Sequence, residues 1–521
     1  MRILPCGPRA LLLEFDDAAR RRAWAAELRA RPPQGVTDVI PAAVTVLLIC
    51  PGGVARVCAD LLRRSRPEPA EPDATAGLLE VPVCYDGPDL AEVAAHVDRS
   101  GAELIAWHSE QIWTVDFTGF LPGFGYLTAA DALTIPRRAT PRPRLPAGTV
   151  GLAGEWSGIY PQTGPGGWQC IGRTDLRTFD LRREPAAELF PGRQVRFDPV
   201  REVGTIDLAP APSQAADTNA STSSTPGGIP ARPSQPGDTP ILTVASVTGQ
   251  VLVQDLGRTG AADLGLGVGG AMDRGALRLA NRLVGNPETA AGLEILGAVT
   301  LRADQPTRCA VTGAPGALLV DDRPAPHHTP IQVPAGAHLT LRAPSVGVRS
   351  YLACGGGIDA ELVAGSRGSS ATVGVGRPAL TAGDTLVSVD APGSWPATGP
   401  VPGLEAAVEL TGQWGPRADW FTAAARARLV GESWQVDAAS DRVGIRLAGS
   451  DLPRHRTGEL ASEGVVRGSM QVSPSGPVVF AADHPITGGY PVIAVLDDAA
   501  VDRLSQVRPG DSVRFRLRAA H

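Results

Sequence analysis

The segments FTGFLPGFGYL at residues 117–127 and LPAGTVGLAGEWSGIYPQTGPGGWQCIGRT at residues 145–174 carry the densest pattern in the chain. Glycine, proline and aromatic residues crowd there beyond what hydrophobic packing requires. Glycine permits positive φ, proline favours turns, and aromatic rings supply large rigid surfaces. The pattern predicts strands joined by rigid, ligand-facing loops. The residues expected to face a ligand are Gly119, Phe120, Pro122, Gly123, Phe124, Gly166, Gly167 and Trp168.

The composition predicts a multidomain protein that is mainly β with α+β parts. The chain has 521 residues, too many for one domain. It contains 61 glycines and 48 prolines with only 5% aromatic residues, a balance that favours turns and short strands. The net charge is −6 and no basic stripe stands out, which argues against nucleic acid as a partner.

Three further properties predict a reduced, cytoplasmic protein that does not enter a membrane. The uncharged run at residues 39–55 contains Pro41, Pro51 and a Gly-Gly pair, so it indicates a buried strand and a turn. The N-terminus lacks the pattern of a signal peptide. The seven cysteines are scattered and never form C-x-x-C, which predicts neither a disulfide framework nor a zinc site.

The absence of lysine is the sharpest compositional feature. All 48 basic residues are arginine. The chain therefore cannot supply a Schiff-base lysine, a P-loop lysine or a covalently biotinylated lysine. Any phosphate held by this chain must be held by arginine, backbone N–H groups or a metal ion.

The distribution of apolar residues divides the chain. Residues 209–240 hold almost no large apolar side chain, so they predict a flexible linker. A Pro- and Gly-rich stretch at residues 392–402 predicts a second joint. The predicted domains are a small α+β domain at 1–77, a β-barrel at 78–208, a β subdomain at 241–390 and a second β subdomain at 391–521.

Helical spacing of apolar residues appears in only a few places. It predicts helices at 18–30, 53–64, 89–99, 102–109, 275–284 and 420–429, while a continuous apolar run predicts a strand at 39–49. The segment Gly265–Gly270 fits G-x-G-x-x-G, but the strand VLVQDL lies well upstream of it. A turn-rich loop leading into a helix is therefore favoured over a dinucleotide site.

Four short motifs recur in the same order at a spacing of about 320 residues. They predict that the chain contains a duplicated β-barrel rather than merely sharing common turn sequences. The pairs are Pro191-Gly192-x-x-Val195-Arg196-Phe197 with Pro509-Gly510-x-x-Val513-Arg514-Phe515, Gly166-Gly167-Trp168 with Gly488-Gly489-Tyr490, Gly148-Thr149-Val150 with Gly468-Ser469-Met470, and Asp116-x-x-Gly119-Phe120 with Asp441-x-x-Gly444-Ile445.

Several polar residues lie beside these loops. His108 precedes the aromatic segment and fits a proton-transfer role or a helix-end cap equally well. Asp483 and His484 end an apolar strand and enter a Gly-Gly-aromatic loop, which favours a site. Arg173 follows a Gly-rich loop and suits an anion, and Glu463 occupies a similar place in the second half. The predicted binding residues of the second half are Gln471, Thr487, Gly488, Gly489 and Tyr490.

The long motifs resemble those of a known family. FTGFLPGFGYL, AGTVGLAGEWSGIYPQTGPGGW and IGRT resemble the B subunit of prokaryotic ATP-dependent 5-oxoprolinase. In the second half, VQDLGRTGAADLGLGVGGAMDRGALRLANRLVGNPETAAGLEI, SEGVVRGSMQV and DHPITGGYPVIAVL are similar to the C subunit of the same enzyme. Both halves also resemble the carboxyltransferase domain of urea carboxylase and urea amidolyase. The resemblance covers nearly the whole chain except residues 209–240.

The resemblance implies cyclophilin-like β-barrels and an enzyme component that opens 5-oxoproline to glutamate with a separate A subunit. It implies ATP with Mg²⁺ as cofactors, a small amide substrate, and a site between the halves. Assembly into a homo-oligomer is left open. The chain departs from the family at Trp156-Ser157, where Gln-Thr is usual, at Arg467, where proline is usual, and at Ile486, where threonine is usual. These changes bear on the substrate more than on the fold.

Two other functions remain open from the sequence. The first is the carboxyltransferase component of a biotin-dependent urea or amide carboxylase, which would take carboxybiotin from another protein because this chain has no lysine. The second is a non-enzymatic regulator of a histidine kinase.

Overall fold

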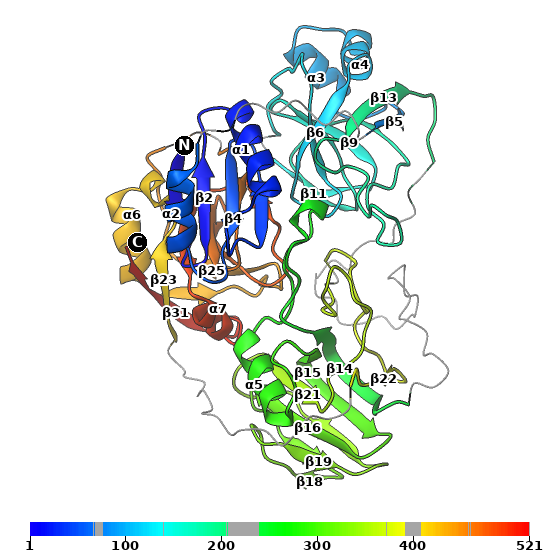
Figure 1. Ribbon diagram of the computed structural model, residues 1–521, viewed down its shortest axis with the longest axis vertical. Coiled ribbons are helices and arrows are strands. Elements are labelled where there is room, and N and C mark those ends of the chain that lie inside the picture. The colour runs from blue at the N-terminus through cyan, green and yellow to red at the C-terminus, as the bar shows by residue number, and fades with distance from the viewer. Residues whose placement is uncertain are drawn as a thin grey trace.

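The computed structural model contains four bodies, and the second (cyan) and third (green) lie toward opposite ends of its longest axis (Figure 1). It describes residues 1–65, 67, 77–138, 140–204, 206, 239–370, 372–390, 408–456, 458 and 460–519. The predicted linker, apart from residues 239–240, and the predicted joint at 392–402 lie outside the described residues.

The N-terminal body is a four-stranded antiparallel sheet with two helices on one face. Its strand order is β1-β2-β4-β3. The strand predicted over residues 39–49 is wrong: Ala42 N–H donates to the Thr45 carbonyl, so the chain reverses there and forms a hairpin. The elements are β1 (Arg2–Pro5), β2 (Ala10–Glu14), α1 (Ala18–Ala30), β3 (Asp38–Pro41), β4 (Thr45–Ile49) and α2 (Ala55–Arg63).

Both faces of this sheet are buried, and they serve different neighbours. Leu11 and Leu13 of β2 pack toward α1 and α2, whereas Leu12 points the other way and joins Val465, Phe480 and other residues of the last body in one apolar cluster. The period-2 alternation of strand side chains explains this division. The sheet is therefore held between its own helices and a barrel more than 400 residues away in the chain.

The second body is a barrel of seven strands. The sheet order is β12-β9-β10-β7-β6-β13-β5, and β5 returns to β12 through reciprocal backbone hydrogen bonds of 2.9 Å between Cys84 and Arg173. A two-stranded sheet of β8 and β11 projects from it. The elements are β5 (Leu78–Val83), α3 (Leu90–His96), α4 (Gly101–Ser109), β6 (Trp113–Thr118), β7 (Gly125–Thr128), β8 (Arg142–Leu145), β9 (Thr149–Ala153), β10 (Trp156–Ile159), β11 (Gly164–Gly166), β12 (Gln169–Arg173) and β13 (Gln194–Pro199).

The last body is a closed barrel with order β23-β30-β27-β28-β25-β24-β31 and a small sheet of β26 and β29. Its helix α7 is absent from the helices predicted above. The elements are β23 (Val408–Trp414), a 3₁₀ turn η3 (Ala418–Trp420), α6 (Ala423–Gly431), β24 (Trp434–Val436), β25 (Gly444–Ala448), β26 (Glu463–Gly464), β27 (Ser469–Ser473), β28 (Gly476–Phe480), β29 (Thr487–Gly488), β30 (Val492–Leu496), α7 (Asp498–Leu504) and β31 (Ser512–Arg518).

The two barrels have the same strand order when each is read from its first strand. In both, the first strand runs parallel to the last, and the remaining ladder pairs are antiparallel. Val195 faces Trp113 in one barrel and Val513 faces Trp434 in the other. Both also show a register shift between the fourth and sixth strands. The predicted duplication of a barrel is confirmed.

One of the four sequence matches is wrong, however. Asp116 lies inside β6, whereas Asp441 precedes β25, which corresponds to β7. The other three matches fall on corresponding strands and turns. A single Asp-x-x-Gly pattern is common before a turn, which explains the false match.

The third body is a twisted β sheet with one long helix on it. The path is β18-β17-β20-β15-β21-β16-β19, with β14 and β22 beside it, and α5 packs over β16 and β21. The elements are β14 (Leu242–Gln254), the 3₁₀ turn η2 (Ala262–Leu264), α5 (Arg274–Val284), β15 (Gly292–Ala303), β16 (Thr307–Gly313), β17 (Leu318–Val320), β18 (Arg323–Pro324), β19 (Ile331–Val333), β20 (His338–Leu341), β21 (Ser350–Cys354) and β22 (Thr385–Leu386).

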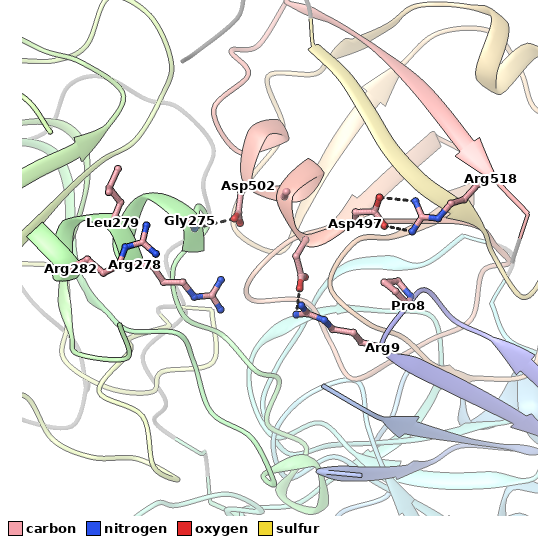
Figure 2. Close-up of a pocket in the computed structure, with 11 residues that line it drawn as sticks. Pro8, Arg9, Gly275, Arg278, Leu279, Arg282, Asp497, Asp502 and Arg518 are labelled. Carbon is pink, nitrogen blue, oxygen red and sulfur yellow. Dashed lines mark hydrogen bonds and ion pairs between the residues drawn. The ribbon is translucent and has the colours of Figure 1, made fainter. Parts of the chain in front are cut away.

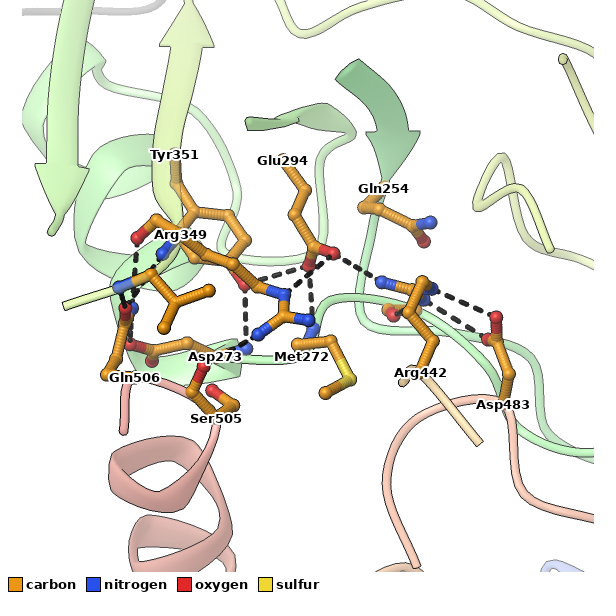
Figure 3. A network of polar contacts seen from close by, with 12 residues as sticks. Gln254, Met272, Asp273, Glu294, Arg349, Tyr351, Arg442, Asp483, Ser505 and Gln506 are labelled. Atoms are coloured by element: carbon orange, nitrogen blue, oxygen red, sulfur yellow. Dashed lines mark hydrogen bonds and ion pairs between the residues drawn. The ribbon is translucent and has the colours of Figure 1, made fainter. Parts of the chain in front are cut away.

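A buried polar network docks this third body onto the last barrel (Figure 3). Arg442 forms ion pairs with Asp483 of its own barrel and with Glu294 on β15. Glu294 also accepts from Met272 N–H and Tyr351 O–H, both at 2.8 Å. Because each of these three charged groups has a partner of opposite charge, the network fixes the orientation of the two bodies.

Candidate functional site

Three loops meet between the two barrels. The first follows β6 and contains the aromatic segment, the second runs from η2 to α5 in the third body, and the third joins β28 to β29. Phe120 N–H donates to Thr487 Oγ1 at 3.1 Å. Gly123 N–H donates to the Leu264 carbonyl at 3.1 Å. The second of the three loops, called the middle loop below, is thus seated between the first and the third.

Glycines allow the close approach of these loops. A Cβ at Gly119 would lie 2.4 Å from Thr487 Oγ1, and one at Gly267 would lie 2.6 Å from the His484 carbonyl oxygen. A Cβ at Gly265, which has φ +75°, would lie 2.8 Å from the Leu121 carbonyl oxygen. The G-x-G-x-x-G segment therefore serves loop contact, as the turn-rich interpretation expected.

His484 is the residue of the site with an unused polar atom. It is 5% exposed, its Nδ1 lies 2.7 Å from the Pro485 carbonyl, and its ring stacks on Phe480. The Nδ1–H must donate to that carbonyl, which leaves Nε2 as an acceptor. Nε2 is buried and has no partner among the described residues. Burial, assisted by the charges of Arg274 and Arg467, lowers the pKa of His484 to about 4, so the ring is neutral at pH 7.

Asp483 beside it does not face open space. Its carboxylate accepts from Arg442 Nε at 2.9 Å and from Arg442 Nη2 at 3.1 Å. Burial would lower the pKa of Arg442, but the charges of Asp483 and Glu294 outweigh burial and raise it. Asp483 is therefore a structural partner of Arg442, which does not fit the proton-transfer role expected for it.

Glu463 is likewise engaged in a buried ion pair. It is 3% exposed and accepts from Arg417, whose guanidinium also reaches Glu14 of the N-terminal body at 2.7 Å. Burial raises the pKa of Glu463, and Arg417 opposes that rise. Glu463 thus lies on the interface with the N-terminal body.

The structure contradicts the expected position of His108 beside the aromatic loop. The residue has no exposed surface and lies inside the first barrel, stacked on Phe197. Its Nδ1 lies 2.7 Å from Tyr85 Oη and its Nε2 lies 2.8 Å from Ser157 Oγ. Burial lowers the pKa of His108 to about 3. With both nitrogens engaged in the core, the geometry favours a structural role.

The remaining predicted residues divide by burial. Phe124 and Trp168 are 1% and 5% exposed and pack with Tyr126 and Tyr160 in an aromatic cluster, so the expectation that they face a ligand is wrong. Arg173 lies at the seam of the first barrel, paired with Asp86 at 2.8 Å, away from the three loops. Gln471 donates to the Tyr490 carbonyl at 2.8 Å, and Tyr490 itself is 40% exposed.

Glycine residues among those predicted to bind a ligand act as spacers. A Cβ at Gly166 would lie 2.4 Å from Tyr160 Oη, and one at Gly488 would lie 2.5 Å from Gln471 Nε2. Gly489 faces Arg137 of the first barrel across the interface. Gly167 lies near Pro141, and Pro122 lies in the loop that Gly265 contacts.

Sequence reasoning missed three residues of this region. Tyr126, a member of the quoted aromatic segment, lies close to Ser462 and Thr487, and burial raises the pKa of its hydroxyl. Arg258 donates to the Gly368 carbonyl at 2.6 Å, and burial lowers its pKa. Arg442 holds the network described above. Each falls within a motif of the chain, QDLGRTG for Arg258 and DRVGIRL for Arg442, but contacts between distant segments cannot be read from such motifs.

Two family models match the chain, one on each side of residues 190–263. Residues 1–189 match the model described as carboxyltransferase domain, subdomain C and D, and residues 264–517 match the model described as carboxyltransferase domain, subdomain A and B. Similarity to curated proteins follows the same division. The first half is 39% identical to the B subunit of 5-oxoprolinase from Escherichia coli O157:H7, over 38% of this chain and 94% of that protein.

The second half is 37% identical to the C subunit of 5-oxoprolinase from Escherichia coli K12, over 50% of this chain and 86% of that protein. The chain belongs to the family of the 5-oxoprolinase B and C subunits, with both regions in one polypeptide. This chain is also similar to the urea amidolyase of Lachancea kluyveri, with 31% identity over 52% of this chain but only 16% of that much longer protein.

Solved structures share the fold of this chain. The crystal structure of TTHA0988 matches with a TM-score of 0.83 and 33% identity, covering 98% of this chain and 99% of that one. The urea carboxylase of Kluyveromyces lactis matches with a TM-score of 0.50 and 28% identity over 54% of this chain and 28% of that one. The predicted family and mainly β fold are confirmed.

Within the described residues, no helix is both long enough and apolar enough to cross a membrane.

Proposed function

We propose that this fused B/C protein is a component of an ATP-dependent 5-oxoprolinase, which opens 5-oxoproline to glutamate together with a separate protein that resembles the A subunit of that enzyme. The observation that carries the proposal is the presence, in one chain, of regions similar to nearly all of the B subunit and most of the C subunit. The seating of the middle loop between the two barrels supports it, because the site needs both halves.

The proposed substrate site is the meeting point of the three loops. His484 supplies an unpartnered neutral nitrogen that can accept a hydrogen bond or a proton from an amide substrate. Thr487 holds the aromatic loop through Phe120, and Gly119 permits that contact. Phe120 and Tyr490 supply partly exposed apolar surface beside it. In this arrangement Asp483 and Glu463 position the loops rather than transfer protons.

The fit of this chain to Mg²⁺ and ATP is poor. Among the described residues no group of three or more histidine, cysteine or carboxylate side chains could hold a metal ion, and the chain has no P-loop lysine, which leaves arginine and backbone N–H groups to meet a phosphate. We therefore assign ATP to the assembled enzyme and no step of the reaction to ATP held by this chain alone.

The test is 5-oxoproline-dependent ATP hydrolysis and glutamate release by the purified chain, with and without the A-type partner. Turnover should require both proteins, and His484→Ala should lower it by about 100-fold while leaving the folded structure intact. Thr487→Val should lower it less, and Thr487→Ser, which keeps the hydroxyl, should restore most of the loss. Full turnover by His484→Ala would remove His484 from the site, and no turnover by the paired wild-type proteins would refute the function.

The second candidate is a carboxyltransferase component acting on urea or a similar amide. The urea amidolyase and urea carboxylase relatives favour it. Its measurement is carboxyl transfer from free carboxybiotin to urea by the purified chain, and activity there without 5-oxoproline turnover would replace the first proposal.

A further inference from the structure

A cavity of about 620 Å³ lies outside the three-loop site, where three bodies of the protein meet (Figure 2). The turn between β1 and β2 contributes Pro8 and Arg9, α5 contributes one wall, and α7 with the end of β31 contributes the opposite wall. Its remaining lining residues are Gly275, Arg278, Leu279, Arg282, Asp497, Asp498, Ala499, Asp502 and Arg518.

The carboxylates in the wall are already hydrogen-bonded. Asp498 accepts from Arg9, and Asp497 accepts from Arg518 at 2.7 and 2.8 Å. Asp502 accepts from Gly275 N–H at 3.0 Å and from Arg467 at 2.6 Å. The wall therefore has no carboxylate left for a further cation (Figure 2).

Arg278 is the cation of the cavity wall that has no close carboxylate partner among the described residues. Its ion pair with Glu288 is 3.7 Å long, and Glu288 is hydrogen-bonded at 2.8 Å to Arg282, one helical turn further on. Among the described residues, Arg278 has no carboxylate within hydrogen-bonding distance. Its side chain is 37% exposed, so an incoming molecule can reach it.

The same helix carries a second arginine, Arg274, which is not a lining residue and on which the charges of Asp498 and Asp502 act from the cavity wall. Arg274 lies one turn before Arg278, and its guanidinium hydrogen-bonds only a carbonyl, that of Gly269 at 3.2 Å. Its Nε is buried without a partner among the described residues. Burial, with the charge of Arg467 beside it, lowers the pKa of Arg274 to about 10.

Like charges four residues apart on a helix repel, and the first turn of a helix already carries positive dipole charge. Arg274, Arg278 and Arg282 follow this spacing along α5. A guanidinium presents a rigid fork of donors that matches the geometry of a carboxylate or phosphate. The missing element beside α5 is therefore a negatively charged group with paired oxygen atoms.

We propose that this cavity binds the phosphate or carboxylate group of a small molecule, with Arg278 as its bidentate anchor. The volume lies within the range of small-molecule sites and exceeds what a single oxyanion fills, so the ligand carries more than its anionic group. The lining residues include no aromatic ring on which a nucleotide base could stack, which disfavours a nucleotide. None of the lining residues belongs to the three loops of the proposed substrate site, and the proposal does not depend on the proposed function.

Because the walls come from three bodies, a bound anion should hold them together and stabilise the folded chain. The experiment uses the full-length protein, with inorganic phosphate or glutamate as the probe and sodium chloride of equal ionic strength as the reference. Thermal unfolding and calorimetric titration are the measurements. At least one of the two probes should raise Tm above the chloride reference and bind with a measurable Kd.

Arg278→Gln should weaken that binding by about tenfold or more, and Arg278→Lys, which keeps the charge without the fork, should lie between it and the wild type. Arg196→Gln is the matched control, because Arg196 is an exposed arginine paired with Glu80 on the first barrel. Binding of phosphate alone identifies the ligand group as a phosphate, and binding of glutamate alone identifies it as a carboxylate. The proposal is overturned if neither probe exceeds the chloride reference, or if Arg278→Gln and Arg196→Gln bind alike.

Discussion

The two barrels share a strand order but place opposite charges at corresponding positions. In the first barrel Asp89 N–H donates to Cys170 on the sixth strand, and in the second Arg417 N–H donates to Val492 on the equivalent strand. Asp89 pairs with Arg142, which lies opposite Gly166, while Arg417 pairs with Glu463, which lies opposite Gly488. Both barrels therefore have an ion pair at this place, but the acidic and the basic residue have exchanged positions.

The reversal follows from what each pair contacts. Arg142 is 25% exposed and Asp89 keeps a second partner, Arg138 at 2.8 Å. The side chains of Arg417 and Glu463 are 5% and 4% exposed, and the carboxylate of Glu14 in the N-terminal body also pairs with Arg417. Strand geometry therefore specifies that an ion pair stands at this position, and the neighbouring body determines which residue carries which sign.

Removing the arginine from each pair should give the largest difference between the barrels. Arg417→Met leaves Glu463 and Glu14 without their shared cation in a buried interface, so we expect a loss of about 3–5 kcal/mol in the free energy of unfolding. Arg142→Met leaves Asp89 with Arg138 and with the Cys170 N–H, so we expect a loss of about 1 kcal/mol. Urea unfolding of both variants measures the difference, and equal losses would contradict the contrast between a pair with both side chains buried and a pair with its arginine partly exposed.

A position in the last turn of a helix, α4 in the first barrel and α6 in the second, gives a second contrast, which depends on pH. Trp113 Nε1–H donates to the His108 backbone carbonyl, and Trp434 Nε1–H donates to the Leu429 backbone carbonyl. Each acceptor lies five residues before its tryptophan, so His108 and Leu429 correspond. The pKa of His108 is about 3 in the folded chain and should be about 6.5 when unfolded. Between these two pKa values the unfolded chain binds a proton at His108 and the folded chain does not. The free energy of unfolding present at pH 7 is therefore partly lost as the pH falls.

His108→Leu transfers the residue of the second barrel into the first. We expect it to cost about 2 kcal/mol at pH 7, since the hydroxyls of Tyr85 and Ser157 lose their partner. It should also remove about 1.4 kcal/mol per pH unit from the slope of stability between pH 6 and 4. Because His484 has a pKa of about 4 and contributes similarly, part of the wild-type slope should remain. Unfolding measured at several pH values checks this, and an unchanged slope would show that His108 is not held neutral.

The paired tryptophans should show the smallest difference. Trp113→Phe and Trp434→Phe each remove a donor to a helix carbonyl at the same register, with the rings 1% and 0% exposed. We expect each to cost about 1–2 kcal/mol and the two losses to agree within about 0.5 kcal/mol. A larger disagreement would mean that the common strand order does not give the barrels a common packing.

Local features of the fold could be predicted from the sequence where a period or a turn decides them. The helix at 18–30 is confirmed with its bounds, and α5 begins one residue before its prediction. Helix α7 was missed because its seven residues follow directly on a buried strand and give too short a period. The single strand predicted at 39–49 failed because an apolar hairpin and an apolar strand look alike in sequence.

The site was harder to predict than the fold. The meeting of the two loop regions at Phe120 and Thr487 agrees with the predicted place between the halves. The roles of individual side chains depend on burial, which a motif does not reveal. Asp483 and Glu463 form ion pairs with arginines from other segments, Arg442 and Arg417. Phe124 and Trp168 are part of a buried hydrophobic core.

The apolar cluster that joins β2 to the last barrel has a consequence for relatives in which the two halves are separate chains. Leu12 and Leu47 come from the first, B-like half, and Val465, Ile486 and Val492 come from the second, C-like half. Such a shared core, with a loop of one half inserted into the other, is the interface of an obligate heterodimer. Separate chains with this arrangement would each expose a hydrophobic surface until they met, so neither would be stable alone at the concentration at which the complex is stable.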